Sequence, residues 1–366
     1  MLFFQSPENG GTRTYFHQLT DYFQKRNKKI YLFVDSNDYT GELVAYCHEK
    51  NITLQPLPTW FTKSEFRGKF LTWAGLRYLF KNAKYSMFLL WSYMRIFPRL
   101  VFVSVGWPFT WFRILLLPGK KLYIQHVMPL HNLDRGNKLL LRTSLLIGKT
   151  QFISVSDFCR NNMKHFWLGK YKKLQTVYNY FEIKNHHSQG KSSRTKLRVL
   201  ALARVEDGKD PFLWIEIAKK ISQSRTNVQF VWAGKGSLLE EARLRCKGYD
   251  NIQFIGFVED VDALYAASDI YFEPTKREAH GISVVGAMAW GLPVITTANG
   301  GTVESVIDGI NGYVVDTSDI SGILERFNLL LNIDSLRADM GQEGKKRFQK
   351  MYTKGMWEKQ MDILIE

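Results

Sequence analysis

One stretch of the chain, residues 273–301, limits the possible folds more than any other. It reads EPTKREAHGISVVGAMAWGLPVITTANGG and directly follows the apolar run Ala267–Phe272, which predicts a strand. After a turn comes a helix-compatible segment, Ile282–Trp290, which a Gly-Leu-Pro sequence ends. A second strand, Val294–Thr297, follows. This order predicts a βαβ unit whose helix N-terminus can bind an anion through the backbone at Gly281, Ile282 and Ser283.

Strand and helix signals alternate along most of the chain, which predicts parallel, doubly wound sheets and an α/β fold. The predicted strands of the first half are Leu2–Phe4, Ile30–Val34, Ile52–Leu54, Leu100–Val105, Lys121–His126, Phe152–Ser156 and Thr176–Asn179. Those of the second half begin with Leu197–Ala203, Val228–Ala233 and Ile252–Val258. The polar segment Glu182–Lys196 reads as an interdomain linker. We therefore predict domains at 1–181 and 197–350, a linker at 182–196 and a helical tail at 351–366.

Positive charge is concentrated in the first half. The formal net charge is +16, and from Phe61 to Lys120 ten basic residues stand against one acidic residue. The same segment contains four tryptophans (Trp73, Trp91, Trp107 and Trp111). Basic residues mixed with aromatic rings suit an anionic membrane surface, while the uncharged runs are shorter than the ~20 residues that a spanning helix needs. We expect a peripheral membrane protein; an aromatic core with a solvated basic face is the alternative.

Several classes of protein are disfavoured by what the sequence contains. The cysteines Cys47, Cys159 and Cys246 show neither disulfide nor metal spacing, which favours a reducing cytoplasm. The N-terminus lacks the basic start and long apolar core of a secretory signal. The adjacent His186 and His187 lie in the polar linker, where solvation is the simplest reading. We therefore expect a cytoplasmic location, no metal and no nucleic-acid partner.

Chemically versatile residues follow the predicted strands. Arg204 comes after the first strand of the second domain and Lys209 comes one turn later, and two cations there suit a diphosphate leaving group. Gly234 opens a Gly-Lys-Gly turn after the next strand, a signal that is weak by itself. His126 ends a strand of the first domain, where ligands of open α/β sheets collect. Ordinary surface ion pairs and a structural histidine are the alternatives.

Together these residues resemble the donor motif of retaining GT-B glycosyltransferases of the large sucrose-synthase and mannosyltransferase-like family (family 4, glycosyl transferases group 1). Arg204 and Lys209 match the family's Arg-then-Lys pair. The rest of the motif is matched by Glu278, Gly281, Ala287–Ala289, Gly291–Ile295 and Gly300–Gly301. The resemblance is strong from Arg198 to Val315 and looser before Ile153. It implies two Rossmann-like doubly wound domains that face each other across a cleft, with the C-terminal helix crossing back to the first domain.

The resemblance also implies an activity and a set of site residues. The activity is that of a retaining, metal-independent hexosyltransferase that needs no cofactor and moves a sugar from a nucleotide-diphosphate donor to a hydroxyl group. The catalytic residues would be His126, near the anomeric centre or the acceptor, and Glu278, on the donor sugar. The diphosphate would be bound by Gly10, Gly11, Arg204, Lys209, Gly281, Ile282 and Ser283, and the base by Gly234, Phe257 and Val258. The basic segment points to a glycan or lipid-linked acceptor at the inner membrane face, in polysaccharide, lipopolysaccharide or glycolipid assembly.

The sequence departs from the family pattern at Gly286, where the family has a second Glu that binds the donor ribose. A glycine cannot make that bond, so a catalytically degenerate donor-binding or partner subunit is the main alternative. A sugar-nucleotide epimerase or a phosphorylase of similar fold would need acid–base carboxylates or a cofactor lysine motif, which are not visible. The sequence does not identify the sugar, the base or the acceptor.

Overall fold

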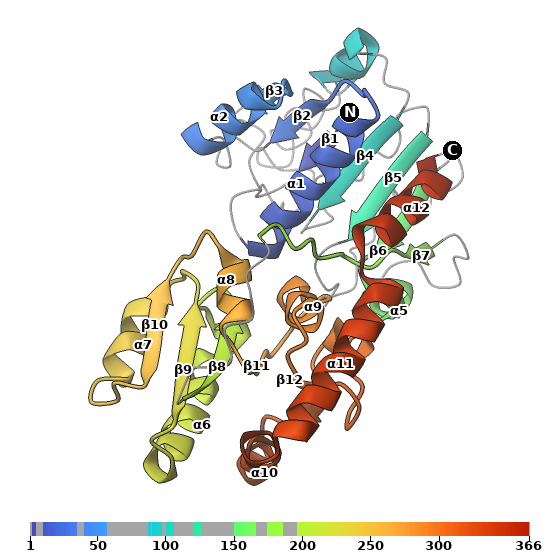
Figure 1. Ribbon diagram of the computed structural model, residues 1–366. Coiled ribbons are helices and arrows are strands. Elements are labelled where there is room, and N and C mark those ends of the chain that lie inside the picture. The colour runs from blue at the N-terminus through green and yellow to red at the C-terminus, as the bar shows by residue number, and fades with distance from the viewer. Residues whose placement is uncertain are drawn as a thin grey trace, which may run out of the picture. The chain divides into compact units, whose positions relative to one another are not determined.

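The computed structural model describes residues 2–4, 10–34, 40–56, 87–88, 90–96, 100–105, 120–125, 150–165, 174–185 and 196–365. The chain divides into two compact α/β units (Figure 1). The first comprises Met1–Val155 and Cys159–Thr176, and the second comprises Ser156–Phe158 and Val177–Glu366. The tail and residues 177–181 thus group with the second unit. Two Rossmann-like α/β units constitute the GT-B fold that the sequence predicts.

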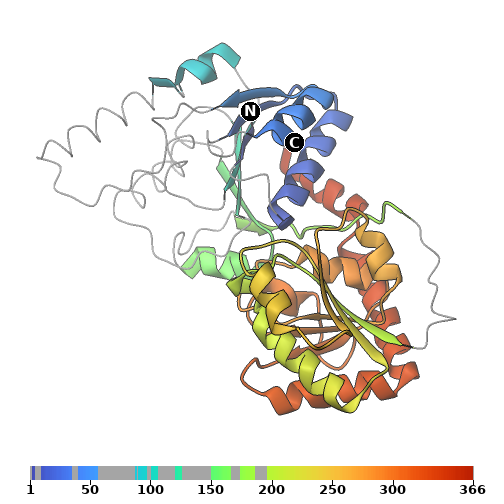
Figure 2. The same cartoon turned by 90° about the vertical axis from the view of Figure 1, so that its left-hand side faces the viewer.

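The first unit contains a parallel sheet of order β3-β2-β1-β4-β5-β6-β7. Its strands are β1 (Leu2–Phe4), β2 (Tyr31–Val34), β3 (Thr53–Pro56), β4 (Leu100–Val105), β5 (Lys120–Gln125), β6 (Thr150–Ser154) and β7 (Leu174–Thr176). Helices α1 (Gly10–Lys25) and α2 (Gly41–Glu49) lie together beside the sheet (Figure 2), and α5 (Asp157–Met163) follows β6. Because β1 pairs with both β2 and β4, the strand order reverses there.

The second unit contains a parallel sheet of order β10-β9-β8-β11-β12-β13. Its strands are β8 (Leu197–Leu202), β9 (Val228–Ala233), β10 (Ile252–Gly256), β11 (Ile270–Glu273), β12 (Val294–Thr297) and β13 (Gly312–Val315). Its helices are α6 (Pro211–Ser224), α7 (Leu239–Arg245), α8 (Val261–Ala266), α9 (Ile282–Ala289), α10 (Ile320–Asn332), α11 (Asp334–Met351) and α12 (Lys354–Ile365). Short 3-10 turns span Asp207–Lys209 and Gly301–Glu304.

Aspartates fix the starts of three helices in this unit. The Asp210 carboxylate accepts the Leu213 N–H before α6, Asp260 accepts that of Ala263 in α8, and Asp319 accepts that of Gly322 in α10. Pro211 adds a helix-compatible φ at the first position of α6. Each cap satisfies one backbone donor that the helix leaves unpaired.

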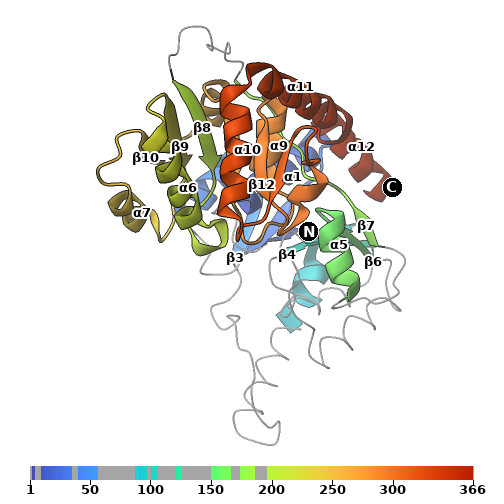
Figure 3. The same cartoon turned by 90° about the horizontal axis from the view of Figure 1, so that it is seen from below.

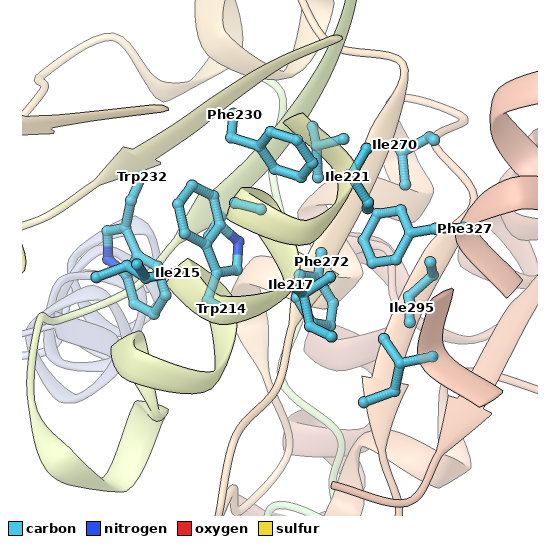
Figure 4. Packing of buried hydrophobic residues seen from close by; sticks show 14 of the residues in the cluster. Trp214, Ile215, Ile217, Ile221, Phe230, Trp232, Ile270, Phe272, Ile295 and Phe327 are labelled. Atoms are coloured by element: carbon cyan, nitrogen blue, oxygen red, sulfur yellow. The ribbon is translucent and has the colours of Figure 1, made fainter. Parts of the chain in front are cut away.

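The two faces of the second sheet bury separate hydrophobic clusters. Alternate residues of β9 show this, since Phe230 and Trp232 pack into one cluster and Val231 into the other. The first cluster includes residues of α6 and α10, which run side by side in Figure 3, and Figure 4 shows Trp214 of α6 and Phe327 of α10 among its side chains. The second includes residues of α8 and α9. Burial on both faces explains why these strands read as continuous apolar runs.

The structure corrects three element predictions. The strand predicted from Ala267 begins at Ile270, because Ala267 still caps α8. The strand predicted at Thr176–Asn179 is instead Leu174–Thr176. The sequence Ser6–Gly11 predicts a turn after the first strand, but the helix begins at Gly10, so both Gly10 and Gly11 belong to the first turn of α1.

Some predicted features lie outside the described residues. These are His126, residues 186–195 of the linker and most of the basic, aromatic segment 61–120. Among the described helices, none is both long enough and apolar enough to span a membrane.

Truncating Phe327 tests the packing of the first cluster. This fully buried ring contacts the rings of Phe230 and Phe272. We expect Phe327→Ala to lower the free energy of unfolding by about 3–5 kcal/mol in urea titrations, because it leaves a cavity. The control Leu244→Ala, at a side chain that is 72% exposed, should change stability by no more than about 0.5 kcal/mol. Equal effects of the two variants would contradict this packing.

Candidate active site

The predicted site residues of the second unit gather at the point where its strand order reverses. β8 pairs with β11, and the chain leaves these neighbouring strands in different directions. Lys209 lies in the turn after β8, and Glu278 lies in the loop after β11. The Thr275 hydroxyl donates to the Gly208 carbonyl at 3.0 Å, and the Lys276 N–H donates to the same oxygen at 3.0 Å, which ties the two loops together. Such switch points are where open α/β sheets bind ligands.

Lys209 lies at the centre of a group of polar side chains. Its Nζ donates to Glu273 Oε1 at 2.5 Å and also to Glu278 Oε2. The second oxygen of Glu273 accepts from the hydroxyls of Tyr271, at 2.8 Å, and Ser283, at 2.9 Å. The side chains of Lys209 and Glu278 retain 17% and 19% exposure, whereas that of Glu273 is fully buried. The group is thus buried at Glu273 and accessible to solvent at Lys209 and Glu278.

The two accessible members of this group are held in their charged forms. Burial lowers the pKa of Lys209, but the adjacent carboxylates of Glu273 and Glu278 raise it by more, so the net pKa lies well above its ordinary value. Burial raises the pKa of Glu278, but Lys209 and the N–H groups of Ala279 and His280 lower it by more. An ammonium ion and a carboxylate are therefore both present at neutral pH.

The N-terminus of α9 presents backbone N–H groups beside this cluster. Its N-cap is Gly281, in the left-handed conformation with φ 86°, and within the described residues no side chain caps it. Ser283, in the first turn, is fixed by its bond to Glu273. A helix N-terminus without a side-chain cap offers unpaired donors and the positive end of the helix dipole to an anion.

A glycine loop holds the backbone of Glu278. The Glu278 N–H donates to the Asn299 carbonyl at 3.3 Å, and the Gly301 N–H donates to the Glu278 carbonyl at 3.0 Å. A Cβ at Gly300 would lie 2.0 Å from that carbonyl oxygen, so this approach requires glycine. The Gly-Gly loop of the motif therefore positions Glu278.

The residues predicted to contact the base lie after β9 and β10. The Gly234 N–H donates to the Gly256 carbonyl at 2.7 Å, and a Cβ at Gly234 would lie 1.9 Å from the Ala203 carbonyl oxygen. Phe257 is 64% exposed, and Lys235 Nζ lies 5.4 Å from the centre of its ring. Val258 follows it and is partly buried. An exposed ring supported by a rigid turn can stack on a planar ligand.

Arg204 differs from Lys209 in its surroundings. Its side chain is 49% exposed and pairs with Glu206 at 2.8 Å, the surface ion pair that the sequence left open as an alternative. Exposed pairs of this kind contribute little to stability, so Arg204 can exchange its partner for an anionic ligand at small cost.

Tyr265 occupies the space beside Gly286. A Cβ at Gly286 would lie 2.7 Å from the Tyr265 hydroxyl oxygen and 2.9 Å from two ring carbons. This tyrosine is fully buried, and its hydroxyl donates to the Ser283 carbonyl at 2.7 Å. A glutamate at position 286 has no room while Tyr265 keeps this position. The departure from the family motif is thus accompanied by a second residue that fills the gap.

Four residues of this neighbourhood were not predicted from the sequence: Tyr265, Tyr271, Glu273 and His280. Glu273 carried a usable signal, because an acidic residue ends a strand that is otherwise apolar. Glu304, which had no assigned role, accepts the N–H groups of Asp157 at 2.8 Å and Phe158 at 2.6 Å within the second unit.

The site residues predicted in the first unit are not among the residues of the second unit described above. Gly10 and Gly11 form the first turn of α1, and His126 lies outside the described residues. Within the described residues no cluster of three or more His, Cys, Asp or Glu side chains could hold a metal ion.

Comparisons with known proteins identify the class of the second unit. Residues 182–347 match the family "Glycosyl transferases group 1", which confirms the resemblance predicted from the motif. The chain is 28% identical over 217 residues to the capsular polysaccharide biosynthesis glycosyltransferase CapM of Staphylococcus aureus. That match covers 58% of this chain and 55% of CapM, so the chain spans about half the length of this relative.

Solved structures show the same fold along the chain. A glycosyltransferase from Rickettsia africae superposes with a TM-score of 0.79 at 15% identity, covering 99% of this chain and 96% of that one. HepE of Anabaena, solved with UDP and glucose, superposes with a TM-score of 0.74 at 16% identity, covering 99% and 97%. These likenesses confirm the GT-B fold.

Substituting Gly286 tests the contact with Tyr265. We expect Gly286→Ala to lower the free energy of unfolding by about 1–3 kcal/mol, because the new methyl group overlaps the ring. The control is Gly355→Ala in α12, where a Cβ would meet nothing within 4 Å; it should stabilise by about 0.5–1 kcal/mol. Stabilisation by Gly286→Ala would show that Tyr265 does not fill this space.

His280 predicts a loss of stability at mildly acidic pH. Its ring is fully buried, neither nitrogen has a hydrogen-bond partner among the described residues, and burial lowers its pKa to about 4. Since the unfolded residue has a pKa near 6.5, the unfolded chain binds a proton first as the pH falls. Stability should therefore decline from about pH 6.5 and reach a loss of about 3 kcal/mol near pH 4.

Urea titrations between pH 7 and pH 5 measure this decline in the free energy of unfolding. The variant His280→Phe should abolish it, while the control His48→Gln, at an exposed residue, should leave it unchanged. An unchanged slope in His280→Phe would rule out His280 as the source.

Proposed function

We propose that this protein is a retaining glycosyltransferase that moves a sugar from a nucleoside-diphosphate donor to a hydroxyl group and requires no metal ion. The observation that carries the proposal is the juxtaposition of Lys209, Glu278 and the N-terminus of α9 at the switch point of the second sheet. The match to the glycosyl transferases group 1 family supports it, as does the UDP and glucose in the HepE complex.

In this proposal the cations and α9 stabilise the departing diphosphate. As the bond between the anomeric carbon and the phosphate oxygen breaks, negative charge grows on that oxygen. Lys209 and the N–H groups at Gly281–Ser283 can stabilise this charge from their present positions, and Arg204 can do so once it exchanges Glu206 for the diphosphate. These groups do the work that a bound cation would otherwise do. The new bond joins the acceptor oxygen to the anomeric carbon, and the acceptor hydroxyl gives its proton to the departing diphosphate oxygen.

Glu278 and Phe257 would recognise the two ends of the donor. One Glu278 oxygen is bonded to Lys209, and the other accepts the Ala279 N–H at 2.9 Å, which fixes the carboxylate beside the α9 N-terminus. From there it can accept hydrogen bonds from sugar hydroxyls. Phe257, exposed at the end of β10, offers a ring on which a base can stack. His126 would act near the anomeric centre or the acceptor, and Gly10 and Gly11 would contact the diphosphate through their backbone.

The acceptor is proposed to be a glycan or lipid-linked glycan at an anionic, cytoplasmic membrane face. The capsular polysaccharide role in the name of CapM supports a glycan product. In the described part of segment 61–120, residues 90–96 are helical, and Trp91 and Met94 are 50% and 60% exposed. The Arg95 guanidinium lies 5.3 Å from the centre of the Trp91 ring. An exposed ring beside a cation suits a membrane interface.

A degenerate donor-binding subunit is the second candidate. The position of Tyr265 against Gly286 supports it, because the family's ribose-binding carboxylate cannot be accommodated there. Such a subunit would bind a nucleoside diphosphate without transferring or hydrolysing the sugar. Turnover separates the two functions.

The test is hydrolysis and transfer across a panel of UDP-, GDP- and ADP-sugars, with wild type and Arg204→Gln. Wild type should turn over one donor, and Arg204→Gln should reduce kcat/KM about ten- to a hundredfold, because one charge-assisted bond is lost. The control Lys220→Gln removes a positive charge at a lysine that pairs with Glu216 in α6 and should leave kcat/KM unchanged. Binding of a nucleotide without turnover would favour the subunit, and no binding by wild type would contradict both.

A further inference from the structure

Glu273 is the most deeply buried charged group of the candidate site, and the family resemblance gives it no role. It ends β11, its side chain is fully buried, and three different side chains donate to it. A carboxylate excluded from water is costly unless donors satisfy its oxygens. An apolar residue at the end of β11 would avoid this desolvation cost.

The partners of Glu273 belong to the two structures predicted to hold the diphosphate. Lys209 comes from the turn after β8, whereas Ser283 comes from the first turn of α9. Oε1 binds the ammonium and Oε2 binds the hydroxyl, so a single carboxylate joins the cation to the helix N-terminus. The Tyr271 hydroxyl holds the carboxylate from its own strand at 2.8 Å.

This arrangement also determines where the ammonium group points. A lysine ammonium carries three N–H donors. In the described structure, two N–H donors of Lys209 bond to Glu273 and Glu278. Glu273 is fully buried, while the Lys209 side chain keeps 17% exposure. Because two of its donors are bonded to these carboxylates, Lys209 has its third donor left for a ligand on the solvent-accessible side of the group.

We propose that Glu273 is a positioning residue of the donor site: by holding Lys209 and Ser283 together it aligns the Lys209 ammonium and the α9 N-terminus on one diphosphate. This inference rests on the proposed function, since it assumes that the site binds a nucleoside diphosphate. The inference adds the buried carboxylate of Glu273 to a candidate site in which Tyr265 fills the space beside Gly286. Glu273 does not touch the donor; it acts through its two partners.

Charge repulsion by Glu273 would change diphosphate binding in the opposite direction. Two carboxylates and one ammonium leave the group with an excess of negative charge, which repels a diphosphate. If this repulsion dominated, neutralising Glu273 would strengthen binding of the anion. If positioning dominates, neutralising it weakens binding, because Lys209 and Ser283 lose their common charged acceptor. The direction of the change in affinity therefore distinguishes positioning from charge repulsion.

The test is calorimetric titration of wild type, Glu273→Gln and Glu206→Gln with UDP, GDP and ADP, with melting temperatures measured alongside. Glu206 is the matched control, because it lies at the same sheet edge and pairs with Arg204 without being buried. We expect Glu273→Gln to weaken binding of the nucleotide that wild type prefers about tenfold or more. Glu206→Gln should leave binding unchanged or strengthen it.

A double-mutant cycle then tests whether the effect passes through Lys209. In a Lys209→Met background, Glu273→Gln should cause much less than its tenfold loss, since the ammonium that it positions is gone. A purely structural role would give the same loss in both backgrounds and would overturn the proposal.

The remaining outcomes are distinct. Wild-type or tighter binding by Glu273→Gln would overturn the positioning role while leaving the proposed function intact, and a failure of wild type to bind any of the three nucleotides would overturn both. If Glu273→Gln does not fold, Tyr271→Phe replaces it, because it removes one donor to Glu273 at a fully buried ring. Tyr271→Phe should weaken binding about fivefold, and wild-type affinity would overturn the proposal.

Discussion

The ion pair between Lys209 and the buried Glu273 is the interaction on which the candidate site depends. Burying a lone carboxylate in a protein interior is strongly unfavourable, whereas a paired and hydrogen-bonded one can be accommodated. Every donor to Glu273 is therefore constrained in position by the need to keep that charge satisfied. Because those donors come from the turn after β8, from β11 and from α9, the pair fixes three chain segments at once.

The parallel sheet makes this arrangement possible. In the order β10-β9-β8-β11-β12-β13, the carboxyl ends of all strands lie at one edge, and the connections diverge after β8 and β11. Apolar clusters on both faces hold the strands, so the polar groups at the edge rest on a rigid base. The Gly-Gly loop after β12 then brings its backbone against Glu278. A polar edge of this kind needs little rearrangement before it binds an anion, which is the condition that the proposed electrostatic stabilisation of a leaving group requires.

The sequence predicted the α/β class, the GT-B fold and most strands of the second unit, because strands buried on both faces read as apolar runs with clear interruptions. It also indicated Lys209, Glu278 and Gly281, since these fall within a recognisable motif. Glu273 and Tyr265 could not be assigned in this way. Their roles depend on contacts between α8, α9 and β11 that have no fixed spacing in the sequence. The start of β11 was misjudged for a related reason: Ala267 reads as apolar strand but serves to end α8.

Hydrogen–deuterium exchange with and without saturating nucleoside diphosphate tests the central claim most directly, since it locates the bound nucleotide without relying on turnover. We expect slower exchange in peptides covering residues 204–209 and 278–285, with a smaller effect at 256–258. Exchange at α6 and α10, on the other face of the sheet from α9, should not change. Protection confined to α6 and α10, or none in the two loops under conditions where the nucleotide binds, would contradict it.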